Sequence, residues 1–205
     1  MTRRRGGPYI ILFIFLLLAL IAPSTLVGGR LALARAFTQT TEEPTGLIIP
    51  VAGGRPKDLR DTFSQARAEG RTHNAIDIMA PHGTPVLAVA DGEVVKLFYS
   101  ARGGNTIYQL SKDKKFVFYY AHLASYAAGL KQGHKARQGE VLAYVGATGN
   151  AGVGNYHLHF AIWLVTDPKR YWDGTNINPY PILRKAAEAE RPDVFSRATK
   201  VEELL

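Results

Sequence analysis

The sequence predicts an all-β domain over residues 49–180, a mainly antiparallel sandwich or barrel-like fold. Short apolar segments alternate with glycine-rich turns through this region, and that pattern is typical of sandwiches and barrels. In one segment, Asn155–Trp163, large apolar residues alternate with His157, His159, Ala161 and Trp163. This period of two belongs to a β-strand with one buried face. Leu158, Phe160 and Ile162 are therefore expected to face the core, opposite His157 and His159.

Further strands are expected on both sides of hairpin and loop signals. Asp91-Gly92 is a hairpin signal, so Thr84–Ala90 and Glu93–Tyr99 are expected to pair. In the segment Phe116–Leu123, Tyr120 and His122 are expected on one face because they are two residues apart. The remaining expected elements are a loop with one helical turn at 55–71, strands at 106–110 and 140–145, a polar loop at 131–139 and a glycine-rich loop at 146–154.

The two ends of the chain differ from this domain. Arg3, Arg4 and Arg5 precede an apolar run from Tyr9 to Ala22, as in an export signal. With the residues up to Val27, the run approaches the roughly 20 residues that span a bilayer. Residues 1–36 are thus expected to form either a cleaved signal peptide or a transmembrane signal anchor. Either one would export the rest to the periplasm or cell envelope, with an anchor holding it at the cytoplasmic membrane.

Residues 37–48 are interpreted as a linker, and residues 181–205 as a short helical tail without chemistry. The chain contains no cysteine, which excludes disulfides and thiolate metal sites. Its formal charge of +8 favours an anionic partner such as a cell wall or a membrane surface. No stripe of basic residues with interleaved aromatics is present, so nucleic acid is not an expected partner.

The six histidines provide the chemistry. His157 and His159 share one face of a predicted strand. His73 and Asp77 are expected on the same side of a loop that leads into another strand. His122, in a third segment, completes the set of candidates. Two imidazoles and one carboxylate form a three-ligand zinc site with an open position for water. Zinc lowers the pKa of such a water to about 7, and the spare imidazoles would assist its attack. Spacing does not decide whether His157 or His159 binds the metal.

Other interpretations fit parts of this pattern. Two histidines and one carboxylate on a β sandwich also form the site of non-haem iron oxygenases, although those sites need no additional imidazoles. The Gly-Thr-Pro-Val and Gln-Gly-Glu-Val hairpins are similar to those of biotinyl or lipoyl carrier domains. His82 and His134 lie in predicted turns and are expected to be exposed. Tyr120, Tyr156 and Trp163 are candidates for lining a groove or for packing in the core.

Taken in order, these residues resemble the lysostaphin-like (LytM-type) zinc metallopeptidases. The three motifs are His73-x-x-x-Asp77, Tyr120-Ala121-His122-Leu123 and His157-Leu158-His159-Phe160. The connecting motifs are Gly83-Thr84-Pro85-Val86, Asp91-Gly92-Glu93-Val94, Gln138-Gly139-Glu140-Val141 and Gly146-Ala147-Thr148-Gly149. The resemblance covers roughly residues 49–180. One departure is Ala75, where many members of the family have glycine.

The resemblance implies an antiparallel β fold with one zinc ion on the floor of a groove. His73, Asp77 and His159 would bind the zinc, and His122 and His157 would be the catalytic imidazoles. The implied activity is hydrolysis of peptide bonds in peptidoglycan cross-links. Some relatives have lost metal ligands and act instead as non-enzymatic activators of cell-wall amidases. All five functional positions are intact here, which favours the enzyme, with peptidoglycan peptide as substrate and an envelope protein as a candidate regulator.

Overall fold

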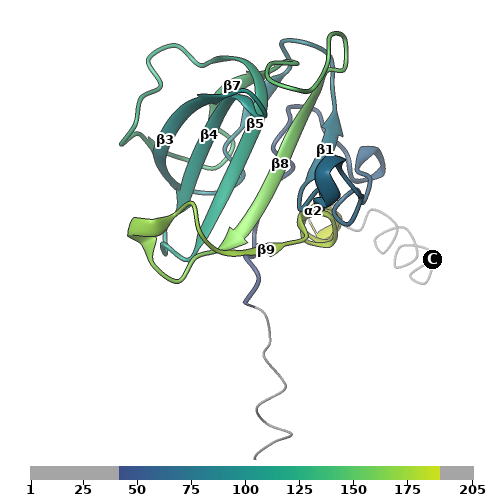
Figure 1. Ribbon diagram of the computed structural model, residues 1–205. Helices are drawn as coiled ribbons and strands as arrows, with labels where there is room; N and C mark the ends of the chain where they lie inside the picture. The colour runs from purple at the N-terminus through teal and green to yellow at the C-terminus, as the bar shows by residue number, and fades with distance from the viewer. Residues whose placement is uncertain (1–41, 190–205) are drawn as a thin grey trace, which may run out of the picture. The chain divides into compact units, whose positions relative to one another are not determined.

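The computed structural model describes residues 42–189, and these residues form a nine-stranded, antiparallel β-sheet (Figure 1). The predicted, mainly antiparallel β fold is therefore confirmed. The strands are β1 (Ile76–Met79), β2 (Pro85–Leu87), β3 (Gly92–Ser100), β4 (Gly104–Ser111), β5 (Phe116–Tyr126), β6 (Lys135–Ala136), β7 (Val141–Val145), β8 (His157–Leu164) and β9 (Thr175–Ile177). Three short 3₁₀ helices, η1 (Pro56–Asp58), η2 (Ala68–Gly70) and η3 (Pro168–Arg170), lie in the connections.

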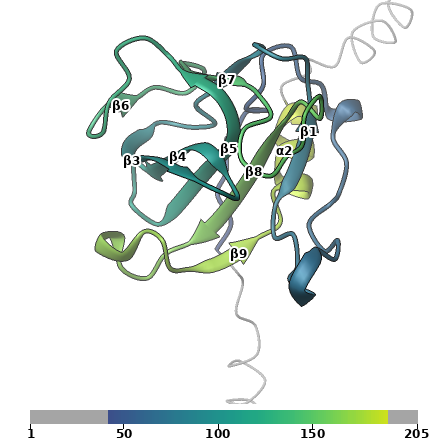
Figure 2. The same ribbon diagram turned by 45° about the horizontal axis from the view of Figure 1, so that its top comes forward.

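The main path of the sheet has the order β1-β8-β5-β4-β3-β6, and Figures 1 and 2 show β8, β5, β4 and β3 side by side. Strand β5 pairs with β4 along one edge, and along the other it pairs first with β8 and then with β7. Strands β8 and β7 thus follow one another along the same edge of β5. His122 lies at this point, between the last residue paired with β8, Ala121, and the first paired with β7, Leu123.

The core lies beneath β5 and β8, and the predicted alternation of β8 is confirmed. Leu158, Phe160 and Ile162 are completely buried in the main apolar cluster. Full burial of each such side chain stabilises the fold by about 1.5–3 kcal/mol. The opposite face of the strand carries His157 and His159, so the apolar face fixes the direction in which both imidazoles point. A slip of one residue in register would bury the histidines and expose the apolar side chains.

The predicted hairpin across Asp91-Gly92 is wrong. Strand β2 is only three residues long and pairs with β7, whereas β3 pairs with β4 and β6. The turn chemistry of Asp-Gly is local, but Val86 and Ala88 on either side of the end of β2 are completely buried. Their burial directs β2 toward β7 instead of back along β3.

Strand β5 contains a β-bulge that changes the direction of His122. Two residues of β5, Ala121 and His122, stand opposite the single residue Thr106 of β4. His122 has a left-handed backbone conformation with a φ of 61°. Such a conformation costs a residue other than glycine about 1–2 kcal/mol, and the hydrogen bond from His122 N–H to Gly103 O (2.8 Å) helps to hold it. Bulges re-aim side chains in this way next to active sites.

The bulge corrects the expectation that Tyr120 and His122 share a face. Tyr120 is completely buried in the core, where its hydroxyl group donates a hydrogen bond to Gln109 Oε1 (2.6 Å) and accepts one from Val89 N–H (3.0 Å). His122 instead reaches the outer face together with Tyr119 and Ala121, which line the same groove. Strict alternation fails here because the bulge adds one residue to the strand.

The helix α2 (Pro179–Ala189) ends the described region. It begins before the start of the predicted tail, and its residues Ile182 and Leu183 are buried in the core. Leu47, near the other end of the described region, is also buried there. Within residues 42–189, no helix is long and apolar enough to cross a membrane. The predicted signal peptide or anchor at 1–36 and the last part of the tail lie outside the described residues.

Candidate metal centre

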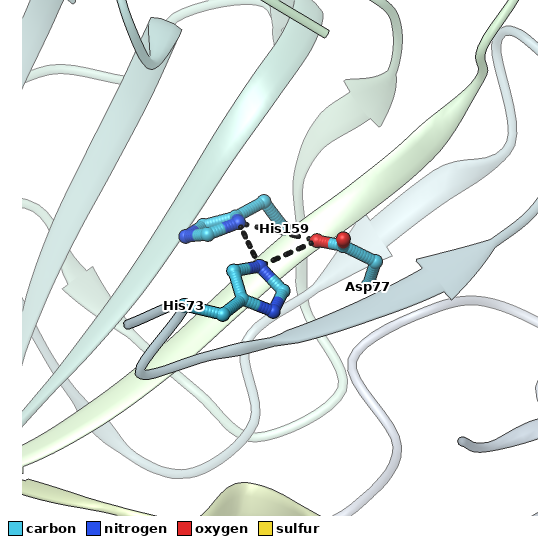
Figure 3. Close-up of side chains that lie close together, drawn as sticks. All are labelled: His73, Asp77 and His159. Carbon is cyan, nitrogen blue, oxygen red and sulfur yellow. Dashed lines mark hydrogen bonds and ion pairs between the residues drawn. The ribbon is translucent and has the colours of Figure 1, made fainter. Parts of the chain in front are cut away.

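His73, Asp77 and His159 come together from the segment before β1, from β1 itself and from β8, which pairs with β1 (Figure 3). Asp77 in β1 is directly opposite His159 in the antiparallel pairing of β1 with β8. His73 lies in the segment that leads into β1, as expected, and Asn74 between the two has a left-handed conformation with a φ of 56°. The sheet register and this turn together place the three side chains on one face.

The distances between their donor atoms are those of a set of metal ligands. His73 Nε2 is 3.0 Å from Asp77 Oδ1 and 3.0 Å from His159 Nδ1, and His159 Nδ1 is 3.2 Å from Asp77 Oδ1. Ligands about 2.0–2.1 Å from a tetrahedral zinc ion would lie about 3.3 Å apart. Three nitrogen and oxygen atoms, with no cysteine among them, also match the ligand types of a catalytic zinc site. The residues therefore fit the metal that the sequence predicts.

The other ring nitrogen of His73 indicates its tautomer. His73 Nδ1–H donates to Thr62 O (2.9 Å), which leaves a lone pair on Nε2, facing the carboxylate oxygen of Asp77. Two lone pairs at this distance repel each other unless a cation lies between them. The hydroxyl oxygen of Thr62 accepts a hydrogen bond from Asp77 N–H (3.1 Å), so one residue fixes both ligands. Such outer-shell bonds orient metal-binding histidines in known sites.

The second carboxylate oxygen of Asp77 is held by Arg67. Arg67 Nη2 lies 2.8 Å from Asp77 Oδ2, and this leaves Oδ1 to face the two imidazoles. Burial opposes ionisation of Asp77, but the neighbouring imidazoles of His159 and His73 outweigh it and keep the pKa of the carboxyl group far below its ordinary value. Asp77 is thus an anion at neutral pH, as a metal ligand must be.

His157 and His122 are the two further imidazoles beside this group. His157 Nε2 lies 3.7 Å from Asp77 Oδ1, and its Nδ1–H donates to Asn155 O (2.8 Å). The centre of the His122 ring is 4.9 Å from that of His157 and 5.5 Å from that of His159. The structure therefore brings all five predicted residues together, with His159 closer to Asp77 than His157 is.

His122 is oriented by the loop that contains Thr148, and this loop packs closely against Gly104 at the start of β4. Its Nδ1–H donates to Thr148 O (2.8 Å), and Thr148 Oγ1 accepts from Asn105 N–H (3.0 Å). A side chain at Gly104 would approach Thr148 Oγ1 to 2.1 Å, so only glycine permits this contact. Burial lowers the pKa of His122 to about 4, against the opposing effect of the bond to Thr148. Burial also lowers the pKa of His159, although Asp77 opposes this change. His122 is therefore neutral at pH 7, with a free lone pair on Nε2.

A groove of about 440 Å³ contains these side chains. All five predicted residues line it, and the other lining residues are Arg67, Ala68, Arg71, Thr72, Arg102, Gly103, Tyr119, Ala121, Asn150, Ala151 and Asn155. They come from the η2 segment, the β3–β4 turn, β5 and the glycine-rich loop before β8. Segments distant in sequence thus form its walls.

The remaining aromatic and histidine residues that were considered in the sequence lie outside the groove. Tyr120 packs in the core and Trp163 packs against Tyr108 and Tyr119, so neither lines the groove; Tyr119 does. His82 is exposed, as predicted. His134 is only half-exposed, because its Nε2 is 2.6 Å from Glu140 Oε1.

Sequence reasoning missed Arg67, Arg102 and Tyr119. Tyr119 alone carried a signal, since alternation places it opposite the buried face of β5. The arginines lie in loops, where no periodicity indicates the direction of a side chain. Only the folded chain shows that they reach the groove.

Comparison with known proteins identifies the family of this site. The model of Peptidase family M23 matches residues 71–179, more than half of the chain, and the chain belongs to this family. Cell division protein DipM of Caulobacter vibrioides is 33% identical over 133 residues, which are 62% of this chain and 21% of DipM. Peptidoglycan DD-endopeptidase ShyC of Vibrio cholerae is 32% identical over 133 residues, 65% of this chain and 28% of ShyC. The match thus spans only 21–28% of the length of these relatives.

Solved structures of the same family share the fold. The catalytic domain of the antimicrobial peptidase lysostaphin from Staphylococcus simulans aligns with a TM-score of 0.52 and 26% identity, over 62% of this chain and 91% of that one. A structure described as a putative glycyl-glycine endopeptidase from Ruminococcus gnavus aligns with a TM-score of 0.53 and 32% identity, over 65% of this chain and 55% of that one. The β-sheet that carries the candidate metal centre is therefore the fold of M23 peptidases.

Proposed function

We propose that this protein is a zinc metalloendopeptidase that hydrolyses peptide bonds in peptidoglycan cross-links. One observation carries the proposal: within the region matched by the M23 family, the donor atoms of His73, Asp77 and His159 approach to 3.0–3.2 Å beside two further imidazoles. The descriptions of relatives, the peptidoglycan DD-endopeptidase ShyC and the antimicrobial peptidase lysostaphin, support the class of reaction.

The metal that fits best is zinc. His73 Nε2, Asp77 Oδ1 and His159 Nδ1 would hold it, and zinc at such a site polarises a carbonyl group and makes water nucleophilic at neutral pH. Two histidines and one carboxylate would also suit iron, as in the oxygenases. The additional imidazoles favour zinc, because proton transfer during hydrolysis needs them and an iron site does not.

His122 and His157 would handle the protons of the reaction. Each donates its Nδ1–H to a backbone carbonyl, so its Nε2 is free to accept a proton from the attacking water. The imidazolium that results can stabilise negative charge on the tetrahedral oxygen and then return the proton to the leaving amine. The low pKa of His122 keeps it in the accepting form before the reaction.

The location of the protein is part of the proposal. The export signal predicted at residues 1–36 would place the domain in the periplasm or cell envelope, in contact with peptidoglycan and, if retained, anchored to the membrane. A regulatory envelope protein would be a second partner. The non-enzymatic alternative is less favoured, because it needs a missing ligand and all five histidine and aspartate positions are present.

Digestion of peptidoglycan tests the activity. Purified peptidoglycan is incubated with the zinc-loaded protein, and mass spectrometry of the products is expected to show new peptide amino termini that name the bond cut. The same digest with His157→Ala is expected to show none. Absence of new termini with zinc-loaded wild-type protein would contradict the peptidase and favour a regulatory role.

A second prediction concerns Arg67. Replacement of Arg67 by alanine frees Asp77 Oδ2 and allows the carboxylate to rotate, so we expect the zinc affinity to fall by about 10- to 100-fold, as for other outer-shell partners. Competition with a chromogenic chelator measures this directly, without any substrate. Arg55→Ala is the control, because Arg55 forms a similar ion pair with Asp58 outside the groove. Equal zinc affinity of the Arg67 and Arg55 variants would show that Arg67 does not position the ligand.

A further inference from the structure

The groove that holds the candidate metal centre carries an excess of positive charge. Among residues 42–189, its charged lining residues are Arg67, Arg71, Arg102 and Asp77. Asp77 is already used by the two histidines through Oδ1 and by Arg67 through Oδ2. Arg71 and Arg102, here called the arginine pair, therefore face the groove without an anionic partner among its lining residues.

One carboxylate outside the lining holds both members of the arginine pair. Glu69 Oε2 lies 2.9 Å from Arg102 Nη2 and 3.5 Å from Arg71 Nε. Two guanidinium groups share this single oxygen, so a net positive charge remains. The side chains of Glu69 and Arg102 are 68% and 62% exposed, and ion pairs of this kind are weak and readily exchanged. Glu69 thus occupies a carboxylate-binding position that another carboxylate can take.

The backbone ties the arginine pair to the reacting centre. Arg71 is two residues before His73, and its carbonyl oxygen accepts a hydrogen bond from Arg67 N–H (2.8 Å). Arg102 O accepts from Asn150 N–H (3.0 Å), and the adjacent Gly103 O accepts from the amide of His122 (2.8 Å). The backbone of one arginine is therefore held beside a candidate metal ligand, and the backbone of the other beside a candidate catalytic imidazole.

We propose that the arginine pair binds a carboxylate of the substrate peptide in place of Glu69, and that the groove consequently selects acidic peptides over neutral ones. Guanidinium groups bind carboxylates through paired, charge-assisted hydrogen bonds. A glycine bridge has no side-chain carboxylate to offer, whereas a peptide that contains an acidic residue near the cut bond does. This inference rests on the proposed peptidase function and specifies its substrate class.

The test compares one peptide in two charge states. The probes are a cross-linked stem peptide released from peptidoglycan and the same peptide with its carboxylates converted to carboxamides. Binding is measured by calorimetry on zinc-loaded His157→Ala protein, so that no cleavage occurs. We expect at least about tenfold tighter binding of the acidic form, with a preference that decreases as salt is added.

Substitutions assign the preference to particular residues. Arg71→Gln with Arg102→Gln is expected to bring the ratio of the two affinities close to one. Glu69→Gln is expected to strengthen binding of the acidic peptide several-fold, because the internal competitor is removed, and structural damage would have the opposite sign. Arg55→Gln, with the same 62% exposure as Arg102 and an ion pair of its own, should leave the ratio unchanged.

The outcomes separate this inference from the proposed function. Equal binding of both peptides, weaker binding by Glu69→Gln, or an equal loss in Arg55→Gln would overturn the role of the arginine pair. Cleavage of both peptides at equal rates by wild-type protein would overturn it as well and leave the peptidase intact. Cleavage of neither peptide, with zinc bound, would instead contradict the proposed function.

Discussion

Replacement of His159 by alanine is expected to abolish both zinc binding and peptide hydrolysis. The substitution removes one of three donor atoms that lie 3.0–3.2 Å from one another. Only two protein ligands, His73 and Asp77, would then remain for the metal. Loss of an outer-shell partner typically costs 10- to 100-fold in metal affinity, so loss of a direct ligand should cost more than about 100-fold. Elemental analysis after dialysis, together with release of peptides from peptidoglycan, measures the two effects.

The matched control for this change is His82→Ala. His82 is an exposed histidine outside the groove, with its ring next to that of Tyr156. The control should keep one zinc ion per chain and normal hydrolysis. A His159→Ala protein that retained a full zinc content would exclude His159 as a ligand and return the choice to His157, whose Nε2 is 3.7 Å from Asp77 Oδ1.

Replacement of His122 by alanine is expected to decrease the rate of hydrolysis without loss of zinc. His122 is not part of the group of three donor atoms, so the zinc content should be unchanged. A positioned general acid or base contributes typically 10²–10⁴-fold, and we expect a decrease in kcat of about this size. Alanine at this position loses the hydrogen bond to Thr148 O. It also has to adopt the left-handed backbone conformation of residue 122, which is unfavourable for any residue with a Cβ atom.

His122→Asn and His134→Ala make this prediction sharper. Asparagine tolerates the left-handed conformation of residue 122 and so keeps the bulge, but it cannot accept a proton. His134→Ala removes a histidine that contacts Glu140 outside the groove. Loss of activity in His122→Asn, with zinc retained and His134→Ala active, would support proton transfer. Full activity of His122→Asn would remove His122 from the chemistry.

The strand pattern and the chemistry-bearing residues could be predicted from the sequence. In β8 one complete face is apolar, and burial of Leu158, Phe160 and Ile162 leaves only one direction for His157 and His159. The order of the histidine motifs was sufficient to indicate the family and to select the five residues that converge in the groove. These properties are local, because they depend on the identity and spacing of residues within single segments.

The pairing of segments was decided only by the tertiary structure. Asp91-Gly92 indicated a hairpin, but burial of Val86 and Ala88 pairs β2 with β7. The bulge in β5 turned His122 away from the face of Tyr120, since one additional residue reverses a period of two. Arg67, Arg71 and Arg102 reached the groove from loops whose course depends on contacts far along the chain. Residue identity therefore determined which groups are available, and long-range packing determined which of them meet.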